Sequence, residues 1–237
     1  MLRFMFDEPE RKAEGQLADA IRLMNQFAAM LQSRVEAGQD TDHKLRTYEI
    51  WTKGLLASLN ELEQSCYAAN RYRERVQAVS VSQMSEEELL DYRRYVYFDK
   101  NAFIRVFSLM DKLSILLNDM LEMKTERIKP HFSYFTVLRN MREKNAHPGL
   151  TWKLNDVKEK NKEAMNRLRK RRNVEVHYMN SEMQDDLVQS HKDYGEEVRL
   201  ENIASQASDL GQGLELVVDS LSLTFQYACE KLQTRKA

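Results

Sequence analysis

Glycine and proline are scarce in this chain, and that scarcity limits the folds open to it. Only ten of its 237 residues are Gly or Pro, about a third of the share in an average protein. Sheet-rich folds need such residues at frequent turns, and this chain cannot supply them. The composition therefore argues against β-sandwiches, barrels and propellers, and against collagen-like or Pro/Gly-rich disordered chains. It predicts an all-α protein.

The remaining composition is that of a chain that folds around a core. Hydrophobic residues make up 42%, charged residues make up 31%, and the net charge is only -1, whereas disordered chains combine low hydrophobicity with high net charge. Cys66 and Cys229 fall in separate expected helices, so we interpret them as small buried residues of a reducing, cytoplasmic compartment. No apolar run approaches the roughly 18 residues of a membrane span, so no membrane partner is expected.

Apolar residues recur at spacings of three and four, which predicts a series of long helices. The expected helices cover residues 10–35, 42–72, 86–124, 131–143, 156–189 and 199–232. Ser85 and Glu88 have the spacing of a capping box at the start of the third helix. Residues 150–154 alternate as a short strand would, and Asn155 is placed to cap the helix that follows. We expect a bundle of long antiparallel helices, with an N-terminal helical hairpin or extension (1–80) packed on a helical domain (81–237). One continuous domain over 1–237 is the alternative.

The fifth expected helix carries an unusual concentration of positive charge. Nine Lys or Arg residues stand against three acids between positions 153 and 172, a local net charge of +6. Clustered guanidinium groups on a helix are the electrostatic footprint of a phosphate-binding surface. The candidate phosphate ligands are Arg167, Arg169, Lys170 and Arg171. The alternative is a solvated basic face without a partner.

Three polar side chains are expected to converge at the end of this basic run. Asn173 and His177 are four residues apart and share a helix face. Counting inward positions from Ala164 and Leu168 places Arg172 at a core-facing position, followed by Val176. An arginine there is costly unless it is paired, and its long side chain can reach towards the patch of Asn173 and His177.

This trio has the parts needed for metal-independent RNA cleavage. An imidazole can transfer a proton near neutral pH, and a guanidinium can hold a phosphate and stabilise the charge that develops on it. No metal or cofactor is expected, because HExxH, Cys/His ligand pairs and paired-Asp patterns are missing from the sequence.

The run Arg172-Asn173-x-x-x-His177 resembles the R-x4-6-H signature of the HEPN superfamily (higher eukaryotes and prokaryotes nucleotide-binding domains). These domains are helical bundles in which the motif precedes the final helix. The resemblance would cover about residues 86–232. It implies that Arg172 contacts the phosphate, that His177 is the acid–base residue, and that Asn173 orients the two.

The resemblance also implies partners. Many active HEPN proteins are ribonucleases, some in toxin or phage-defence systems, in which two motifs meet across a dimer. This chain carries one motif, so the resemblance implies a homodimer or a second HEPN chain. HEPN toxins that pair with nucleotidyltransferases often have a tyrosine two residues after the histidine. Here Met179 holds that position and Tyr178 is adjacent to the histidine, which puts that pairing in doubt.

Two functions from different classes follow. The first is a HEPN-type, metal-independent endoribonuclease; the second is a non-catalytic interaction or nucleotide-binding module that docks through its basic helix. Glu175 and Tyr178 are accessory candidates, although an ion pair with Arg171 or Arg172 is the simpler role for Glu175. The aromatic group formed by Tyr92, Tyr95, Tyr97 and Phe98 can stack bases or, more simply, form core or dimer interface.

Overall fold

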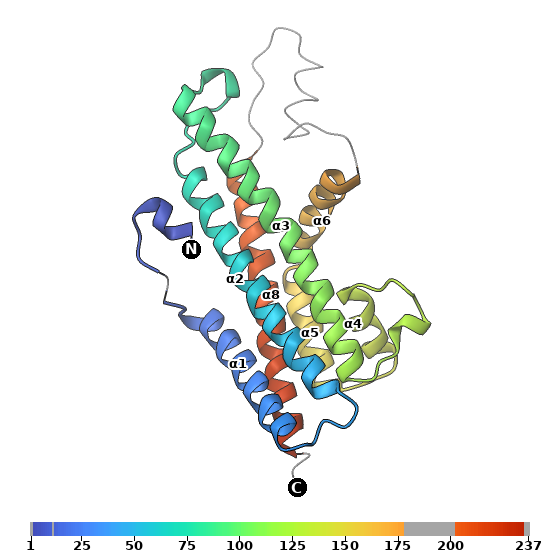
Figure 1. Ribbon diagram of the computed structural model, residues 1–237. Coiled ribbons are helices and arrows are strands. Elements are labelled where there is room, and N and C mark those ends of the chain that lie inside the picture. Colours follow the sequence, from blue (N-terminus) through green and yellow to red (C-terminus); the bar gives the residue numbers. More distant parts are fainter. Residues whose placement is uncertain (1, 11, 178–201, 235–237) are drawn as a thin grey trace. The chain divides into compact units, whose positions relative to one another are not determined.

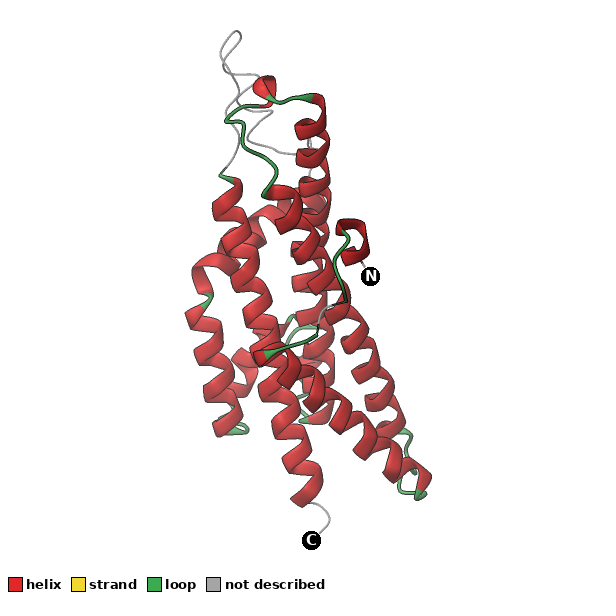
Figure 2. Ribbon diagram, turned by 90° about the vertical axis from the view of Figure 1, so that its left-hand side faces the viewer, coloured by secondary structure: helices red, strands yellow, loops and turns green. Residues whose placement is uncertain are grey.

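The described part of the protein consists of helices and the loops that join them. The computed structural model describes residues 2–10, 12–177 and 202–234, and within these ranges it contains helices and no strand (Figures 1 and 2). The α-helices are α1 (Gly15–Glu36), α2 (Lys44–Arg73), α3 (Glu86–Met120), α4 (Tyr134–Glu143), α5 (Pro148–Lys160), α6 (Lys162–His177) and α8 (Ile203–Thr234). Short 3-10 turns lie at Leu2–Phe6, Val81–Gln83 and Thr125–Arg127. The prediction of an all-α helical bundle is confirmed. Among the described helices, none combines the length and the apolar character required to cross a membrane.

The chain divides into two compact units, each built from several stretches of sequence. Unit 1 comprises residues 1–10, 61–105 and 162–214, and unit 2 comprises residues 11–60, 106–161 and 215–237. The boundary between the units falls inside each of the long helices α2, α3 and α8, so each of these helices contributes one part to unit 1 and one part to unit 2. The division into residues 1–80 and 81–237 stays a prediction.

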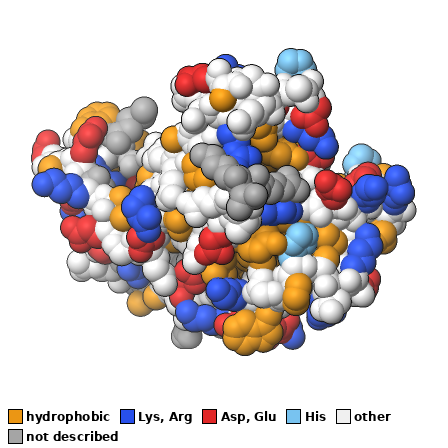
Figure 3. Space-filling view, turned by 90° about the horizontal axis from the view of Figure 1, so that it is seen from below, with side chains coloured by type: hydrophobic (Ala, Val, Ile, Leu, Met, Phe, Trp, Pro, Cys, Tyr) orange, Lys and Arg blue, Asp and Glu red, His pale blue; other side chains and the backbone are white. Residues whose placement is uncertain are grey.

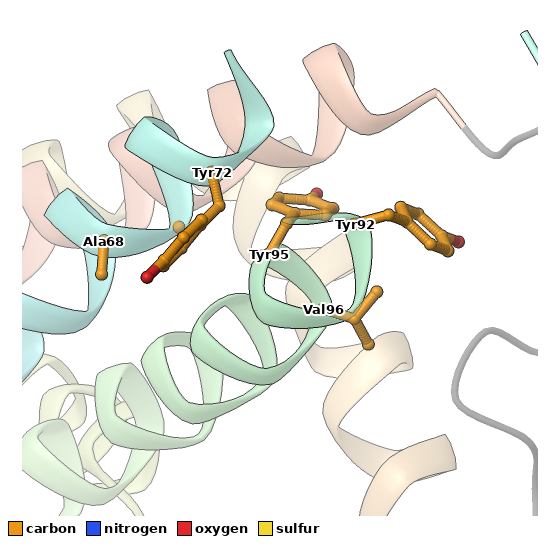
Figure 4. Close-up of a cluster of buried hydrophobic side chains, with 6 residues drawn as sticks. Ala68, Tyr72, Tyr92, Tyr95 and Val96 are labelled. Atoms are coloured by element: carbon orange, nitrogen blue, oxygen red, sulfur yellow. The ribbon is translucent and has the colours of Figure 1, made fainter. Parts of the chain in front are cut away.

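Aromatic side chains form the core of unit 1. Figure 4 shows Tyr72 of α2 and Tyr95 of α3 in the space between these two helices. The Tyr72 ring stacks on Phe98 with centroids 5.8 Å apart, and the Tyr95 hydroxyl donates to Gln206 Oε1 at 3.0 Å. Tyr92 is buried as well, whereas Tyr97 is 64% exposed. The interpretation that these aromatic residues form part of the core is therefore confirmed for Tyr92 and Tyr95.

The core of unit 2 joins α1 and α4 to α8. The rings of Phe27 and Phe225 meet edge to face at 5.4 Å, and the buried Tyr134 hydroxyl donates to Ser220 Oγ at 3.0 Å. Cys229 is buried in this unit and Cys66 in unit 1, both as free thiols. The prediction that both cysteines are small buried residues is confirmed.

The strand-like alternation of residues 150–154, too short to carry a sheet, does not form a strand, because this segment lies in the first half of α5. Leu150 and Leu154 are buried and lie four residues apart, while Trp152 between them is 70% exposed. The apparent alternation is one turn of a helix. Five residues are too few to distinguish the period of two of a strand from the period of 3.6 of a helix. Asn155 consequently lies inside the helix and donates to the Thr151 carbonyl at 2.8 Å, rather than capping a helix.

The single helix expected over residues 156–189 is interrupted at Asn161, where α5 ends and α6 begins. Asn161 is buried, and its side-chain amide donates back to the Val157 carbonyl at 3.0 Å. Such a local side-chain bond competes with helix continuation. Residues 178–189 of the expected helix lie outside the described residues.

The capping box expected at α3 is half formed. The backbone N–H of Glu88 donates to Ser85 Oγ at 3.2 Å. The Glu88 carboxylate instead accepts from the backbone N–H groups of Ala78 and Gln77, both at 2.6 Å. These two bonds lower the pKa of Glu88 and tie the segment after α2 to the start of α3.

Two positions on α3 offer a matched test of the core. Leu113 is fully buried and Ile115 is 48% exposed. We expect Leu113→Ala to lower the free energy of unfolding by about 2–5 kcal/mol, because it removes buried methyl groups and leaves a cavity. Ile115→Ala should cost less than about 1 kcal/mol. Urea denaturation followed by circular dichroism measures both, and equal losses would contradict this burial pattern.

Candidate functional site

The candidate site is carried by α6, which is short, basic and amphipathic. Its apolar residues Ala164, Met165 and Leu168 are buried. They occupy only part of the helix surface, so the orientation of α6 also depends on its charged residues. Figure 3 shows that on one face of the molecule basic, acidic and hydrophobic side chains are intermixed. The positive charge of α6 is therefore a local feature of a nearly neutral chain.

Three ion pairs join one face of α6 to neighbouring helices. Arg167 makes a two-bond contact with Asp209 of α8, at 2.8 and 2.7 Å. Arg171 pairs with Asp99 of α3, and Glu175 pairs with Lys100 of α3 at 2.9 Å. Positions 167, 171 and 175 are spaced by four, so they form one stripe along the helix. This stripe fixes the rotation of α6.

The Arg171–Asp99 pair is the most buried of the three. Its side chains are 21% and 2% exposed, and the Arg171 guanidinium also lies over the Phe103 ring at 4.8 Å. Burial raises the pKa of the Asp99 carboxyl, while the Arg171 charge opposes that rise. Among the described residues, Asp99 Oδ1 and Arg171 Nη1 have no hydrogen-bond partner. The pair is therefore incompletely satisfied and sensitive to the loss of either member.

The opposite face of α6 is open to solvent and carries most of the predicted site. Arg169, Lys170, Asn173 and His177 are all exposed, and Arg169 donates to Asn166 Oδ1 of its own helix at 2.5 Å. Asn173 and His177 share this face, as predicted. Val176 lies beside them and is 53% exposed, so the expectation that Val176 faces the core is wrong. The ion-paired residues Arg167, Arg171 and Glu175 lie on the other side of the helix.

Arg172 lies apart from His177. It is half-buried and its Nε is buried, whereas His177 is exposed. Five residues turn a helix by about 500°, which leaves the two Cα–Cβ directions about 140° apart. One copy of α6 therefore presents Asn173 and His177 together, with Arg172 at the buried edge of the helix.

The other predicted residues are distributed as follows. Arg167 and Arg171, predicted to bind phosphate, are engaged in ion pairs. Glu175 pairs with Lys100 rather than with Arg171 or Arg172, so its predicted partner was wrong. Tyr178 lies outside the described residues. Within residues 2–10, 12–177 and 202–234, no three His, Cys, Asp or Glu side chains are grouped as metal ligands.

The sequence analysis did not predict the two aspartates that pair with the arginines of α6. Asp99 and Asp209 lie 72 and 42 residues from their arginine partners, and no local motif links them. One indication was present for Asp99, which is four residues after Tyr95 and three before Ala102 and therefore shares a helix face with these two buried residues. An acid at such a position needs a buried partner.

A comparison with protein families shows to which family this chain belongs. The model of the HEPN_Cthe2314-like HEPN family matches residues 51–229, three quarters of the chain. The chain belongs to the HEPN family. This match includes α6 with its exposed His177, and it confirms the resemblance inferred from the Arg172–His177 motif. No curated protein matches the chain, and no solved structure does.

The buried pair predicts a measurable dependence of unit 1 stability on Asp99. Asp99→Asn should lower the free energy of unfolding by about 2 kcal/mol, below the 3–5 kcal/mol typical of a broken, fully buried pair because Arg171 keeps some solvent contact. Asp19→Asn is the control, since its pair with Arg22 is exposed on both sides and should contribute less than about 1 kcal/mol. Chemical denaturation compares the two. Equal losses would show that the Asp99 pair does not hold α6.

Proposed function

We propose that this HEPN protein is a metal-independent endoribonuclease whose α6 surface binds the RNA backbone and whose His177 transfers the proton. The observation that carries the proposal is the exposed surface formed by Arg169, Lys170, Asn173 and His177. It combines two cations, an amide and an imidazole on one face of a helix in a protein of the HEPN family. The ion pairs on the opposite face hold this surface towards solvent.

The length of this surface favours a polynucleotide over a single nucleotide. Arg169 and His177 are eight residues apart, or about 12 Å along the helix axis. In B-DNA, successive phosphates of one strand rise by about 3.4 Å along the helix axis. A surface of about 12 Å is therefore longer than the spacing of neighbouring phosphates in a polynucleotide. Arg169 and Lys170 are the residues that would bind phosphates next to the cleaved bond.

The chemistry assigned to His177 is proton transfer within a transesterification. As a neutral imidazole it removes the proton from a ribose 2′-hydroxyl, and the 2′-oxygen attacks the adjacent phosphorus. The bond from phosphorus to the 5′-oxygen breaks, and that oxygen takes up a proton. The products are a 2′,3′-cyclic phosphate and a 5′-hydroxyl. Asn173, four residues before His177 on the same face, is placed to orient the ring or the phosphate.

The position of Arg172 supports a site shared between two chains. Since Arg172 and His177 of one helix point about 140° apart, a single α6 does not present both to one phosphate. A second copy of the chain, or another HEPN chain, would bring its own α6 residues to the same phosphodiester. One histidine would then act as base and the other would protonate the leaving oxygen.

The separation of Arg172 from His177 on α6 also favours a second function. If no second chain completes the site, α6 is a non-catalytic surface that binds RNA, a nucleotide or a partner through its cations. Both functions require Arg169 and Lys170, but only the first requires the imidazole of His177. Substitutions of these two groups therefore separate the functions.

His177→Ala tests the catalytic function. In buffer with EDTA, the purified wild type should cleave single-stranded or structured RNA, and His177→Ala should reduce the rate by about 100-fold or more, the range of general acid–base catalysis. His131→Ala removes another exposed histidine and should leave the rate unchanged. Gel analysis of end-labelled RNA measures the cleavage. An inactive wild type, or a fully active His177→Ala, would reject the ribonuclease proposal.

Charge reversal tests the binding surface. Arg169→Glu with Lys170→Glu should weaken RNA binding and flatten its dependence on salt, because fewer counterions are released from the RNA. Arg127→Glu with Lys129→Glu makes the same change in net charge at exposed positions outside α6. Fluorescence anisotropy over a salt series compares the two doubles. If both lose the same affinity, the α6 surface is not the binding site.

A further inference from the structure

Unit 2 contains a groove that the proposed ribonuclease surface does not use. Its volume is about 470 Å³, and its walls are formed by α1, α5 and α8. The lining positions recur every three or four residues on each helix, so one face of each helix turns towards the groove. Leu23, Val157 and Leu223 supply the apolar part of the lining. A volume of this size accommodates a small organic ligand.

An aromatic ring and carboxylates line the same groove. Trp152 of α5 is 70% exposed. It is one of the two tryptophans in the chain. Asp156 lies one turn further along α5, and Asp219 faces the groove from α8. An exposed indole face attracts cations through its quadrupole, and carboxylates accept hydrogen bonds from them.

The negative charge of Asp219 is only partly compensated by nearby positive charge. It is partly buried, and burial together with the nearby Glu215 raises the pKa of its carboxyl, while Lys160 opposes the rise. Lys160 itself pairs with Glu215. A cation that entered the groove would stabilise the ionised Asp219.

Ser222 adds an unmet acceptor. It lies three residues after Asp219 on the same face of α8 and lines the groove. Its Oγ is buried and has no hydrogen-bond partner among the described residues. Buried hydroxyls are normally satisfied, and a rotation of the Ser222 side chain about χ1 towards the groove would let a ligand N–H group satisfy this one.

The rim also carries two cations, and these limit the choice of ligand. Arg22 is paired with Asp19 at 3.0 Å, so these two charges offset each other. The charges left on the lining are Asp156 and Asp219 against Lys153, a net excess of one carboxylate. That excess suits a singly charged cation better than an anion or a polyvalent cation.

We propose that this groove binds a guanidinium group, stacked on Trp152 and hydrogen-bonded to Asp219 and Ser222. A guanidinium is planar, carries five N–H donors and stacks on aromatic faces. It can therefore meet the ring, the carboxylate and the hydroxyl at once, whereas an ammonium group cannot stack. The guanidinium belongs either to a free small molecule or to an arginine side chain of a peptide. The site is independent of the RNA-binding surface of α6.

An NMR titration tests the proposal on the full chain. The two indole N–H signals, of Trp51 and Trp152, are assigned with Trp152→Phe. Butylguanidine, a singly charged guanidinium compound, should shift the Trp152 signal saturably and leave Trp51, which does not line the groove, in place. Butylamine and inorganic phosphate are the probes that lack the guanidinium. A larger effect from either of them, or equal shifts of both indoles, would overturn the assignment.

Variants of the groove sharpen the test. Asp219→Asn should weaken butylguanidine binding about tenfold, because the hydrogen bond to the ligand loses its charged acceptor, and Ser222→Ala should weaken it about threefold. Glu143→Gln removes an exposed carboxylate elsewhere in unit 2 and should bind as the wild type does. If Asp219→Asn and Glu143→Gln bind equally, the proposal is wrong. An acetylated, amidated Gly-Arg-Gly peptide that binds more tightly than butylguanidine would identify a peptide arginine as the ligand, and weaker binding would identify a free one.

Discussion

The docking of α6 through Arg167, Arg171 and Glu175 determines what the rest of this surface can do. Each of these residues pairs with a residue of opposite charge on α3 or α8, and together they form a stripe on one side of the helix. Because two arginines of the basic run are engaged there, the cations left for a phosphate are those on the opposite side. The positive segment of the sequence is thus divided into an anchoring half and an exposed half, and only the exposed half contains His177.

The helical class, most helix limits and the shared face of Asn173 and His177 could be predicted from the sequence. These features depend on composition and on spacings of three and four, which are local. What could not be predicted depends on distant partners or on short segments. The pairing of Arg171 with Asp99 joins residues 72 positions apart. The helix over residues 150–154 was misassigned because five residues do not distinguish a period of two from one of 3.6. The exposure of Val176 follows from the rotation of α6, which those distant pairs set.

The separation of Arg172 from His177 explains why a motif with the right residues is not by itself a complete site. A spacing of five places the two side chains on different sides of a straight helix, and Arg172 is half-buried while His177 is exposed. If a phosphodiester is cleaved at His177, as we propose, the arginine of the motif at that phosphodiester would come from a second chain. In a homodimer, the partner's copy of the same helix can supply it, which is consistent with one motif in each chain.

Ion pairs, rather than apolar contacts alone, suit the orientation that this helix requires. Buried pairs add little net stability, because the desolvation of each charge offsets most of their attraction. Their best attested role is to specify one arrangement among several. The apolar contacts of Ala164, Met165 and Leu168 are non-directional, so a rotation of α6 by one residue would keep much of that burial. The same rotation of about 100° would separate Arg171 from Asp99 and turn His177 away from its present face. We therefore interpret the three pairs as the feature that selects this rotation, and the incompletely satisfied Asp99 as the cost of holding His177 towards solvent.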